Sequence, residues 1–416
     1  MTAVTFYFQV HQPFRLRPFR FFDIGEGKAY FEEESNQGIF RRVADRCYLP
    51  MNDLLLKLID RYEGRFRCAF SLSGTVIEQM QRWYPEVLHS FQRLAETGAV
   101  EFLCETSHHS LSFLADEEEF LTQVSTQQAL VESLFDQKPV TFRNTELVIS
   151  NDLAAKVESL GFRILLGEGA DSLLQEKSSQ KVYGVKGTKD LKLLLRTYRF
   201  ADDIAFRFSN KDWEGYPLLA DTFADSMAEV PEDAPCLGLF MDYETFGEHQ
   251  WADTGIFDFM EYLPKFLFDK GRFQFQTPKE VAAEHEISER LDIPKPVSWA
   301  DEARDLTAWL GNPMQKAAHE ALYDLLPRAL QAADQGAPEW LEIWRKLSTS
   351  DHVYYMCTKF FADGDVHKYF SPYATPHDAF ITFMNVLEDL ARRLNACLSE
   401  APAEQEPSTE ESSESE

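Results

Sequence analysis

The sequence predicts an α/β fold, a barrel of about seven parallel strands that need not be complete, followed by a helical region. Short apolar runs alternate with segments of helical periodicity through about residue 285, which is typical of parallel strands joined by right-handed crossovers. An open doubly wound sheet would show the same alternation. However, polar residues directly follow at least four of the runs, and the carboxyl ends of barrel strands are where such folds carry their sites. These strand ends favour the barrel.

Seven β-rich runs are the expected barrel strands, at residues 4–10, 66–72, 100–104, 140–143, 162–166, 191–198 and 237–241. A further run at 273–276 is expected to close or flank the sheet. Between the runs lie segments with the apolar spacing of amphipathic helices, expected at 40–62, 73–98, 116–135 and 150–160. Residues 1–285 therefore form the predicted catalytic domain.

Strand signals disappear after about residue 298, and helical periodicity continues at 301–310, 313–332, 338–348 and 376–398. We therefore predict a helical region over residues 286–398 that packs on the barrel. The segment 351–376 links two of these helices and is rich in aromatic residues, and we assign it no function. Residues 399–416 are acidic and of low complexity, which predicts a disordered tail.

The formal net charge of −28 limits the partners of the chain. Such a surface repels nucleic acid and anionic membranes, so a neutral substrate is expected. No apolar run reaches the length of about 18 residues that a membrane helix needs, and the amino terminus lacks the features of a signal peptide. Six scattered cysteines without metal-binding spacing are expected to be reduced. These features predict a cytoplasmic protein and leave its oligomeric state open.

Two acids end the seventh predicted strand. The run LGLFMDYETFGEH at 237–249 changes abruptly from apolar residues to Asp242 and Glu244, which on an extended chain would point to the same side. Two like charges there are unfavourable unless a site uses them. Glu146 follows the fourth strand in the same way. Because hydrolysis of a glycosidic bond requires one ionised and one protonated carboxyl group, Glu146 and Asp242 could flank one sugar at the barrel mouth.

Other residues near strand ends are candidates for substrate binding. His11 follows the first strand, and His108 and His109 follow the third, where one of the two is expected to face the site. Phe246 and Trp251 are candidates for stacking on sugar rings, although a purely structural role is equally compatible with each. A metal site made from histidines of separate loops and a carboxylate is an alternative, but no HExxH-type spacing supports it.

Five short motifs in this order resemble glycoside hydrolase family 57, and within it the α-amylase group. They are HQP at 11–13, GTVIEQ at 74–79, FRNTEL at 142–147, MDYETFGEH at 241–249 and, more weakly, QTPKE at 276–280. The motifs cover about residues 1–285. The resemblance implies an incomplete seven-stranded (β/α) barrel and a retaining mechanism on α-glucans, with no metal or other cofactor.

Matched motif by motif, the resemblance assigns Glu146 as the nucleophile and Asp242 as the general acid/base. Gln9 and Arg143 stand where transferase-like members often have a histidine and an aromatic residue, which favours hydrolysis over transfer. From the motifs and their surroundings, the expected substrate-binding residues are His11, Glu78, His108, His109, Arg143, Glu244, Phe246, His249 and Trp251.

The resemblance predicts a double displacement, which requires the carboxyl groups of Glu146 and Asp242 to lie about 5–5.5 Å apart. The negative charge of Glu244 and partial burial should raise the pKa of Asp242. Three alternatives remain. A 4-α-glucanotransferase or branching enzyme would use the same carboxylates, a metal-dependent deacetylase would use His11, Asp242 and a loop histidine, and a non-catalytic protein would only bind glucan.

Overall fold

Seven strands form the barrel in the computed structural model, which describes residues 1–359 and 371–400. Almost all of the predicted acidic tail lies outside the described residues. Every predicted strand is present, with its ends within two residues of the expected positions. In chain order β1, β2, β3, β4, β5, β7 and β8 are Thr2–Val10, Cys68–Leu72, Val100–Phe102, Thr141–Arg143, Ile164–Glu168, Lys192–Arg196 and Cys236–Asp242.

The barrel is centred on β1, which pairs in parallel with β2 on one side and with β8 on the other. β2 continues to β3, and β7 pairs with β5, which pairs with β4. Two pairs of neighbouring strands share few backbone contacts. β7 meets β8 at one residue pair, Arg196 with Gly238, and β3 approaches β4 only through a bridge from Cys104 to Phe142. The predicted incomplete (β/α) barrel is therefore confirmed.

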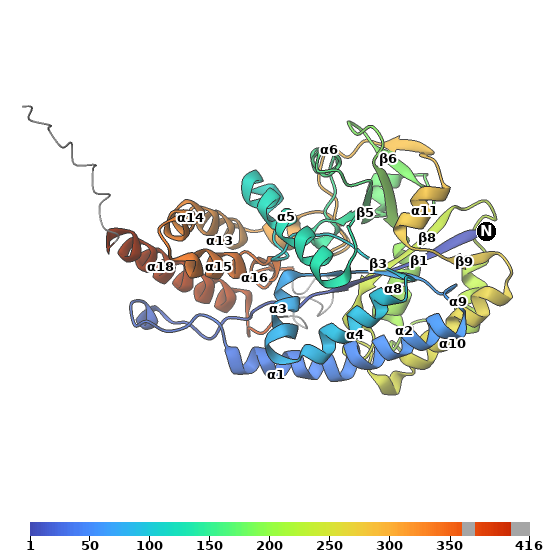
Figure 1. Ribbon diagram of the computed structural model, residues 1–416, viewed down its shortest axis with the longest axis horizontal. Coiled ribbons are helices and arrows are strands. Elements are labelled where there is room, and N and C mark those ends of the chain that lie inside the picture. The colour runs from blue at the N-terminus through green and yellow to red at the C-terminus, as the bar shows by residue number, and fades with distance from the viewer. Residues whose placement is uncertain (360–370, 401–416) are drawn as a thin grey trace, which may run out of the picture.

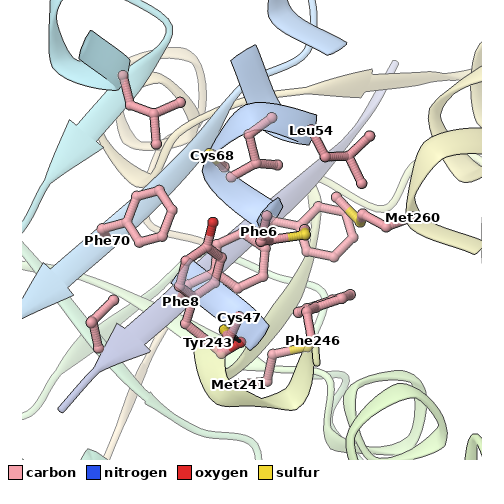
Figure 2. Close-up of a cluster of buried hydrophobic side chains, with 14 of the residues drawn as sticks. Phe6, Phe8, Cys47, Leu54, Cys68, Phe70, Met241, Tyr243, Phe246 and Met260 are labelled. Atoms are coloured by element: carbon pink, nitrogen blue, oxygen red, sulfur yellow. Dashed lines mark hydrogen bonds between the residues drawn. The ribbon is translucent and has the colours of Figure 1, made fainter. Parts of the chain in front are cut away.

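Strand periodicity decides which residues face the barrel interior, because successive side chains of a strand point to opposite sides. In β1 and β8 the helix-facing core contains Val4, Phe6, Phe8, Val10, Leu237, Leu239 and Met241, and the interior core contains Ala3, Tyr7, Cys236 and Phe240. Figure 2 shows part of the helix-facing core. Since Asp242 follows Phe240 by two residues, the same period directs Asp242 to the barrel interior.

Helices surround the barrel, and Figure 1 shows them on the outside of the strands, with α1, α2, α4 and α10 along one side of the view. Helices α1 to α6 are Glu33–Val43, Leu49–Arg61, Gly74–Trp83, Pro85–Glu96, Glu117–Phe135 and Asn151–Ser159. Helices α7 to α11 are Asp171–Leu174, Tyr198–Asp202, Ala220–Met227, Ile256–Asp269 and Pro278–Glu284.

Two predicted helices are divided in the structure. The helix expected at 73–98 breaks at Tyr84, because the next residue is Pro85 and a residue before proline disfavours helical dihedrals. The helix expected at 40–62 continues from α1 to α2 through a π-helical turn, η2, at Ala44–Tyr48. Short 3-10 turns lie at Phe21–Asp23 (η1), Ser112–Leu114 (η3) and Ala252–Thr254 (η7).

Three short strands lie outside the ring, namely β6, β9 and β10 at Tyr183–Val185, Phe273–Phe275 and Glu289–Leu291. β9 pairs with the first residues of β1, so the run predicted at 273–276 flanks the sheet. The sequence did not predict β6 and β10, which pair with each other. Each is three residues long, too short for a clear alternation of apolar and polar residues.

The helices after residue 300 form a second apolar core at the end of the molecule opposite the amino terminus, as Figure 1 shows. Their largest fully buried side chains are Trp309 and Trp344. Helix α14 begins at Leu326, just before Pro327, which divides the helix expected at 313–332. The domain boundary at residue 285 stays a prediction. Helices α12 to α16 and α18 are Thr307–Leu310, Pro313–Tyr323, Leu326–Asp334, Pro338–Leu347, Ser350–Tyr354 and Pro376–Glu400.

Candidate active site

A cavity of about 1100 Å³ opens at the carboxyl ends of the barrel strands. Both predicted catalytic carboxylates, Glu146 and Asp242, line it. Four of the predicted substrate-binding residues also line it, namely His11, His109, Glu244 and His249. The structure therefore brings together residues that follow four different strands.

A layer of polar residues separates the cavity from the apolar interior of the barrel. Each strand contributes its last inward-facing residue, which lies on the strand or just after it. One of these residues is Asp242, and the others are buried, namely Gln9, Ser71, Glu105, Arg143, Glu168 and Arg196. Buried polar groups must satisfy one another or act on a ligand. The layer therefore surrounds Asp242 with charged and hydrogen-bonding groups.

Asp242 ends β8, and its pKa is raised to about 6. Burial is the largest cause, and the negative charge of Glu146 adds to it, while the guanidinium of Arg143 opposes it. The direction of this shift and the part that burial plays agree with the prediction. The negative charge that adds to burial is that of Glu146, while the interaction of Asp242 with Glu244 raises the pKa of Glu244. A carboxyl group in this state can donate a proton at mildly acidic pH.

Glu244 lies in η6, the 3-10 turn Tyr243–Thr245, and not on the extended chain that the sequence suggested. It still lines the cavity, although its side chain is buried. Burial and the charge of Asp242 raise the pKa of Glu244 to about 8. The hydroxyl of Tyr48 donates a hydrogen bond to Oε1 of Glu244. Glu244 is therefore largely uncharged at neutral pH.

Glu146 lies in η4, the 3-10 turn Thr145–Leu147, with a left-handed φ of 60°, a strained backbone position that is common at functional sites. The indole Nε1 of Trp299 donates a hydrogen bond to Oε2 at 2.9 Å, and the hydroxyl of Ser350 donates one to Oε1 at 2.8 Å. Both carboxylate oxygens are therefore held in place.

The environment of Glu146 favours its ionised form. Burial alone would raise the pKa of Glu146, but the close approach and positive charge of the His109 ring, together with the charge of Arg143, outweigh it and hold that pKa below its usual range. The Nε2 atom of His109 lies 3.7 Å from Oε1 of Glu146. Glu146 and Asp242 thus have pKa values pushed in opposite directions, which is the arrangement expected of a nucleophile and its general acid.

His11 contributes to the same wall of the cavity. Its Nε2 atom lies 2.9 Å from Oδ2 of Asp351, and its Nδ1 atom lies 2.7 Å from the hydroxyl of Ser73. Its ring stacks on that of His109, with the ring centroids 4.0 Å apart. Because Asp351 belongs to α16, the helical region contributes directly to the site.

Two expected stacking residues are not in the cavity lining. Phe246 is fully buried and packs edge-on against Phe8 in the helix-facing core (Figure 2), which is incompatible with stacking on a sugar. Trp251 is 59% exposed, but it lies outside the lining. Phe246 lies within the motif at 241–249 and Trp251 two residues after it, both beyond the end of β8, where periodicity ends and no longer indicates direction.

Two further residues that were expected to bind substrate interact instead with charged side chains outside the cavity. The carboxylate of Glu78 accepts a hydrogen bond from Lys346 at 2.7 Å, and the imidazole of His108 lies 3.1 Å from Glu342. Neither residue lines the cavity. Of the two adjacent histidines, only His109 faces the site, as expected of one of them.

Arg143 lies beneath the cavity and does not line it, since its side chain is fully buried. Its guanidinium lies 4.8 Å from the centre of the Trp299 ring, within cation–π range. Within the described part of the chain its guanidinium nitrogens have no hydrogen-bond partner. Arg143 therefore does not reach the cavity to bind substrate directly, although the sequence predicted that it would. Its positive charge instead lowers the pKa of Glu146 and of Asp242 from beneath the cavity.

Residues from beyond the barrel also form the site, which the sequence did not predict. Trp299, Asp351 and Tyr354 line the cavity. Arg304 lines it too and joins a network of charges, in which Arg196 pairs with Asp202 at 2.5 Å and with Glu168 at 3.2 Å, and Arg304 pairs with Glu168 at 3.1 Å. The one available signal was the cluster of aromatic residues and histidine at 351–376, to which no function was assigned.

Among residues 1–359 and 371–400, no group of three His, Cys, Asp or Glu side chains is arranged to hold a metal ion. No helix in the same part of the chain is long and apolar enough to cross a membrane.

The sequence matches the family described as Glycosyl hydrolase family 57 over residues 5–294. The chain belongs to this family. It is 37% identical over 399 residues to a Methanocaldococcus jannaschii protein described as "Putative alpha-amylase", and the match covers 93% of this chain and 83% of that protein. The resemblance seen in the five motifs is therefore confirmed, and the chain is a glycoside hydrolase of family 57.

Solved structures of the family share the fold. A GH57-type branching enzyme from Pyrococcus horikoshii is similar with a TM-score of 0.68 and 14% identity, over 96% of this chain and 92% of that chain. A 4-alpha-glucanotransferase from Thermococcus litoralis is similar with a TM-score of 0.58 and 14% identity, over 89% of this chain. The family 57 chain described here spans only 54% of the length of that transferase.

Proposed function

We propose that this family 57 enzyme hydrolyses α-1,4-glucosidic bonds of starch- or glycogen-type glucans with retention of configuration. One observation carries the proposal. Glu146 and Asp242 line one cavity, and their surroundings favour an ionised Glu146 and a protonated Asp242. Two carboxyl groups in different protonation states are what glycosidic bond cleavage requires.

The reaction would proceed in two displacements. In the first, a carboxylate oxygen of Glu146 attacks the anomeric carbon, the bond to the departing glucan oxygen breaks, and Asp242 gives that oxygen its proton. In the second, the Asp242 carboxylate takes a proton from water, the water oxygen attacks the anomeric carbon, and the bond to Glu146 breaks. This route requires a separation of about 5–5.5 Å between the two carboxyl groups.

The cavity and the charge of the chain support a neutral polymer as the substrate. A volume of about 1100 Å³ lies just above the usual range for small-molecule pockets and leaves room for several sugar units. The net charge of −28 disfavours polyanionic substrates. The name of the M. jannaschii relative supports an amylase-type activity.

The second candidate is transfer of the glycosyl group to another sugar. A transferase would use Glu146 and Asp242 in the same way and would differ only in the acceptor of the second step. The likeness to a branching enzyme and to a 4-alpha-glucanotransferase keeps this candidate open. Gln9 and Arg143, which replace the residues often found in transferase-like members, support hydrolysis.

Incubation with maltoheptaose followed by product identification tests the proposal. We expect shorter malto-oligosaccharides of initially α configuration from the wild type and almost none from Glu146→Gln, which keeps the shape of the side chain but cannot attack. Glu261→Gln is the matched control, since Glu261 lies on the outer helix α10 and pairs with Arg61 at 2.6 Å. Longer or branched products would establish transfer instead, and full activity of Glu146→Gln would refute the assignment.

A further inference from the structure

We propose that Glu105 and His109 act as a positioning pair for Glu146, in which Glu105 keeps the His109 imidazole protonated and this cation keeps the nucleophile ionised. The inference rests on the proposed function, because it assigns the pair a task in that reaction. Nothing in the sequence motifs assigns a role to Glu105. Its role follows from a continuous set of contacts beneath the cavity.

Glu105 is fixed in one orientation at the end of the third strand run. It is completely buried, and both of its carboxylate oxygens are occupied. Gln9 donates a hydrogen bond to Oε1 at 2.8 Å, and Oε2 lies 2.7 Å from Nδ1 of His109. Gln9 is itself held by hydrogen bonds from the hydroxyls of Tyr7 and Ser71. A buried carboxylate held in this way favours a cationic partner.

The backbone of His109 is held as tightly as its ring. The residue has a left-handed φ of 50°, a conformation that is uncommon outside glycine and that histidine tolerates better than most residues. Its N–H donates to the carbonyl of Thr106 at 3.0 Å, and its own carbonyl accepts from the N–H of Ser350 at 2.9 Å. These contacts direct Nδ1 toward Glu105 and Nε2 toward Glu146.

The charges that face His109 decide its protonation. Burial alone would lower the pKa of His109, and Arg143 also lowers it, but Glu105 and Glu146 outweigh both and raise it to about 9. The charge of His109 also acts on the carboxyl groups of Asp242 and Asp351. The ring stacked on it is that of His11, whose pKa is lowered by burial and by the charge of His109, against the opposing charge of Asp351. One imidazolium, on His109, therefore faces Glu146 at neutral pH.

The geometry also gives the direction of the effect on Glu146. A positive charge within about 4–6 Å of a carboxylate lowers the pKa of that carboxylate by about 1–3 units, and here the Nε2 atom lies 3.7 Å from Oε1. The charge of His109 also lowers the pKa of Asp242. Loss of the imidazolium should therefore shift both the acidic and the basic side of the pH–activity profile to higher pH. Damage that is merely structural would lower the rate without shifting the profile.

The test compares Glu105→Gln and His109→Gln with the wild type. ¹³C NMR of the Glu146 carboxyl, recorded in the whole protein without substrate, measures its titration directly. We expect it to move upward by about one pH unit or more in both variants, with the acid limb of kcat/KM on maltoheptaose following it. His89→Gln is the control, since His89 is exposed on α4, and we expect no movement.

The outcomes separate this proposal from the proposed function. If the pKa of Glu146 is unchanged in a folded variant, the proposed role of the pair is refuted. A variant with a lower kcat but an unchanged pH–activity profile refutes it as well. If neither variant folds, the His109 imidazole of the wild type decides, because an imidazole that is neutral at pH 7 overturns the proposal and a protonated one supports it. A wild type that cleaves no glucan would overturn the proposed function, while the carboxyl titration would still decide the role of the pair.

Discussion

Asp242→Asn tests the proposed proton donor directly. Asparagine nearly matches aspartic acid in size but cannot transfer a proton to the departing oxygen. General acid–base catalysis contributes about 10²–10⁴-fold, so we expect hydrolysis of maltoheptaose to fall by this factor. The loss corresponds to about 3–5 kcal/mol of transition-state stabilisation.

The pKa of Asp242 in the structure determines how strongly the activity should depend on pH. With a pKa of about 6, Asp242 is about nine-tenths protonated at pH 5 and about one-tenth protonated at pH 7. Because the protonated form is the active one, the wild-type kcat/KM should fall about tenfold between these two pH values. The residual activity of Asp242→Asn should lack this fall, since the titrating group is gone.

A change of leaving group separates loss of the acid from loss of the fold. An aryl α-maltoside with a weakly basic phenolate needs little protonation, so we expect Asp242→Asn to form the glycosyl-enzyme from it almost as fast as the wild type. Azide, which needs no general base, should then restore turnover and yield an α-glycosyl azide. An equal loss on the aryl substrate and on maltoheptaose, without rescue by azide, would refute the acid/base role of Asp242.

Two further predictions concern residues that the barrel motifs do not contain. Trp299→Phe keeps a ring over Arg143 but removes the 2.9 Å hydrogen bond to Glu146. Because a hydrogen bond to a charged group contributes about 1.5–3 kcal/mol, we expect kcat on maltoheptaose to fall about tenfold or more. An unchanged kcat would contradict this role of Trp299. In Asp351, burial would raise the pKa, but the hydrogen bond with His11, the charge that His11 gains in acid and the charge of His109 hold the Asp351 pKa well below its usual range. Ionised Asp351 therefore stabilises the fold above its unfolded-state pKa of about 4, and this contribution is lost as the pH falls through the folded-state value. Urea unfolding should show Asp351→Asn less stable than the wild type at pH 7 and the difference smaller at pH 3, whereas an equal difference at both pH values would exclude this linkage.

The direction of a side chain was predictable from the sequence where the residue belongs to a regularly alternating strand. The alternation in β8 places Asp242 on the side of Phe240, and the apolar runs located all seven barrel strands. Just beyond the strand ends the direction of a side chain was not predictable, because loop backbones do not follow a period. There Phe246 turns into the core, while Glu244, in a 3-10 turn, remains at the cavity.

The sequence by itself determined the family, the barrel and the two candidate carboxylates, because each depends on local order along the chain: apolar alternation, strand ends, and motifs in a fixed succession. Only the tertiary structure decided how these carboxylates differ. The hydrogen bonds to Glu146 come from Trp299 and Ser350, more than 150 residues further along the chain, and burial, which no single segment determines, raises the pKa of Asp242. Protonation depends on the charges and the solvent that surround a group in three dimensions, and these exist only after the chain has folded.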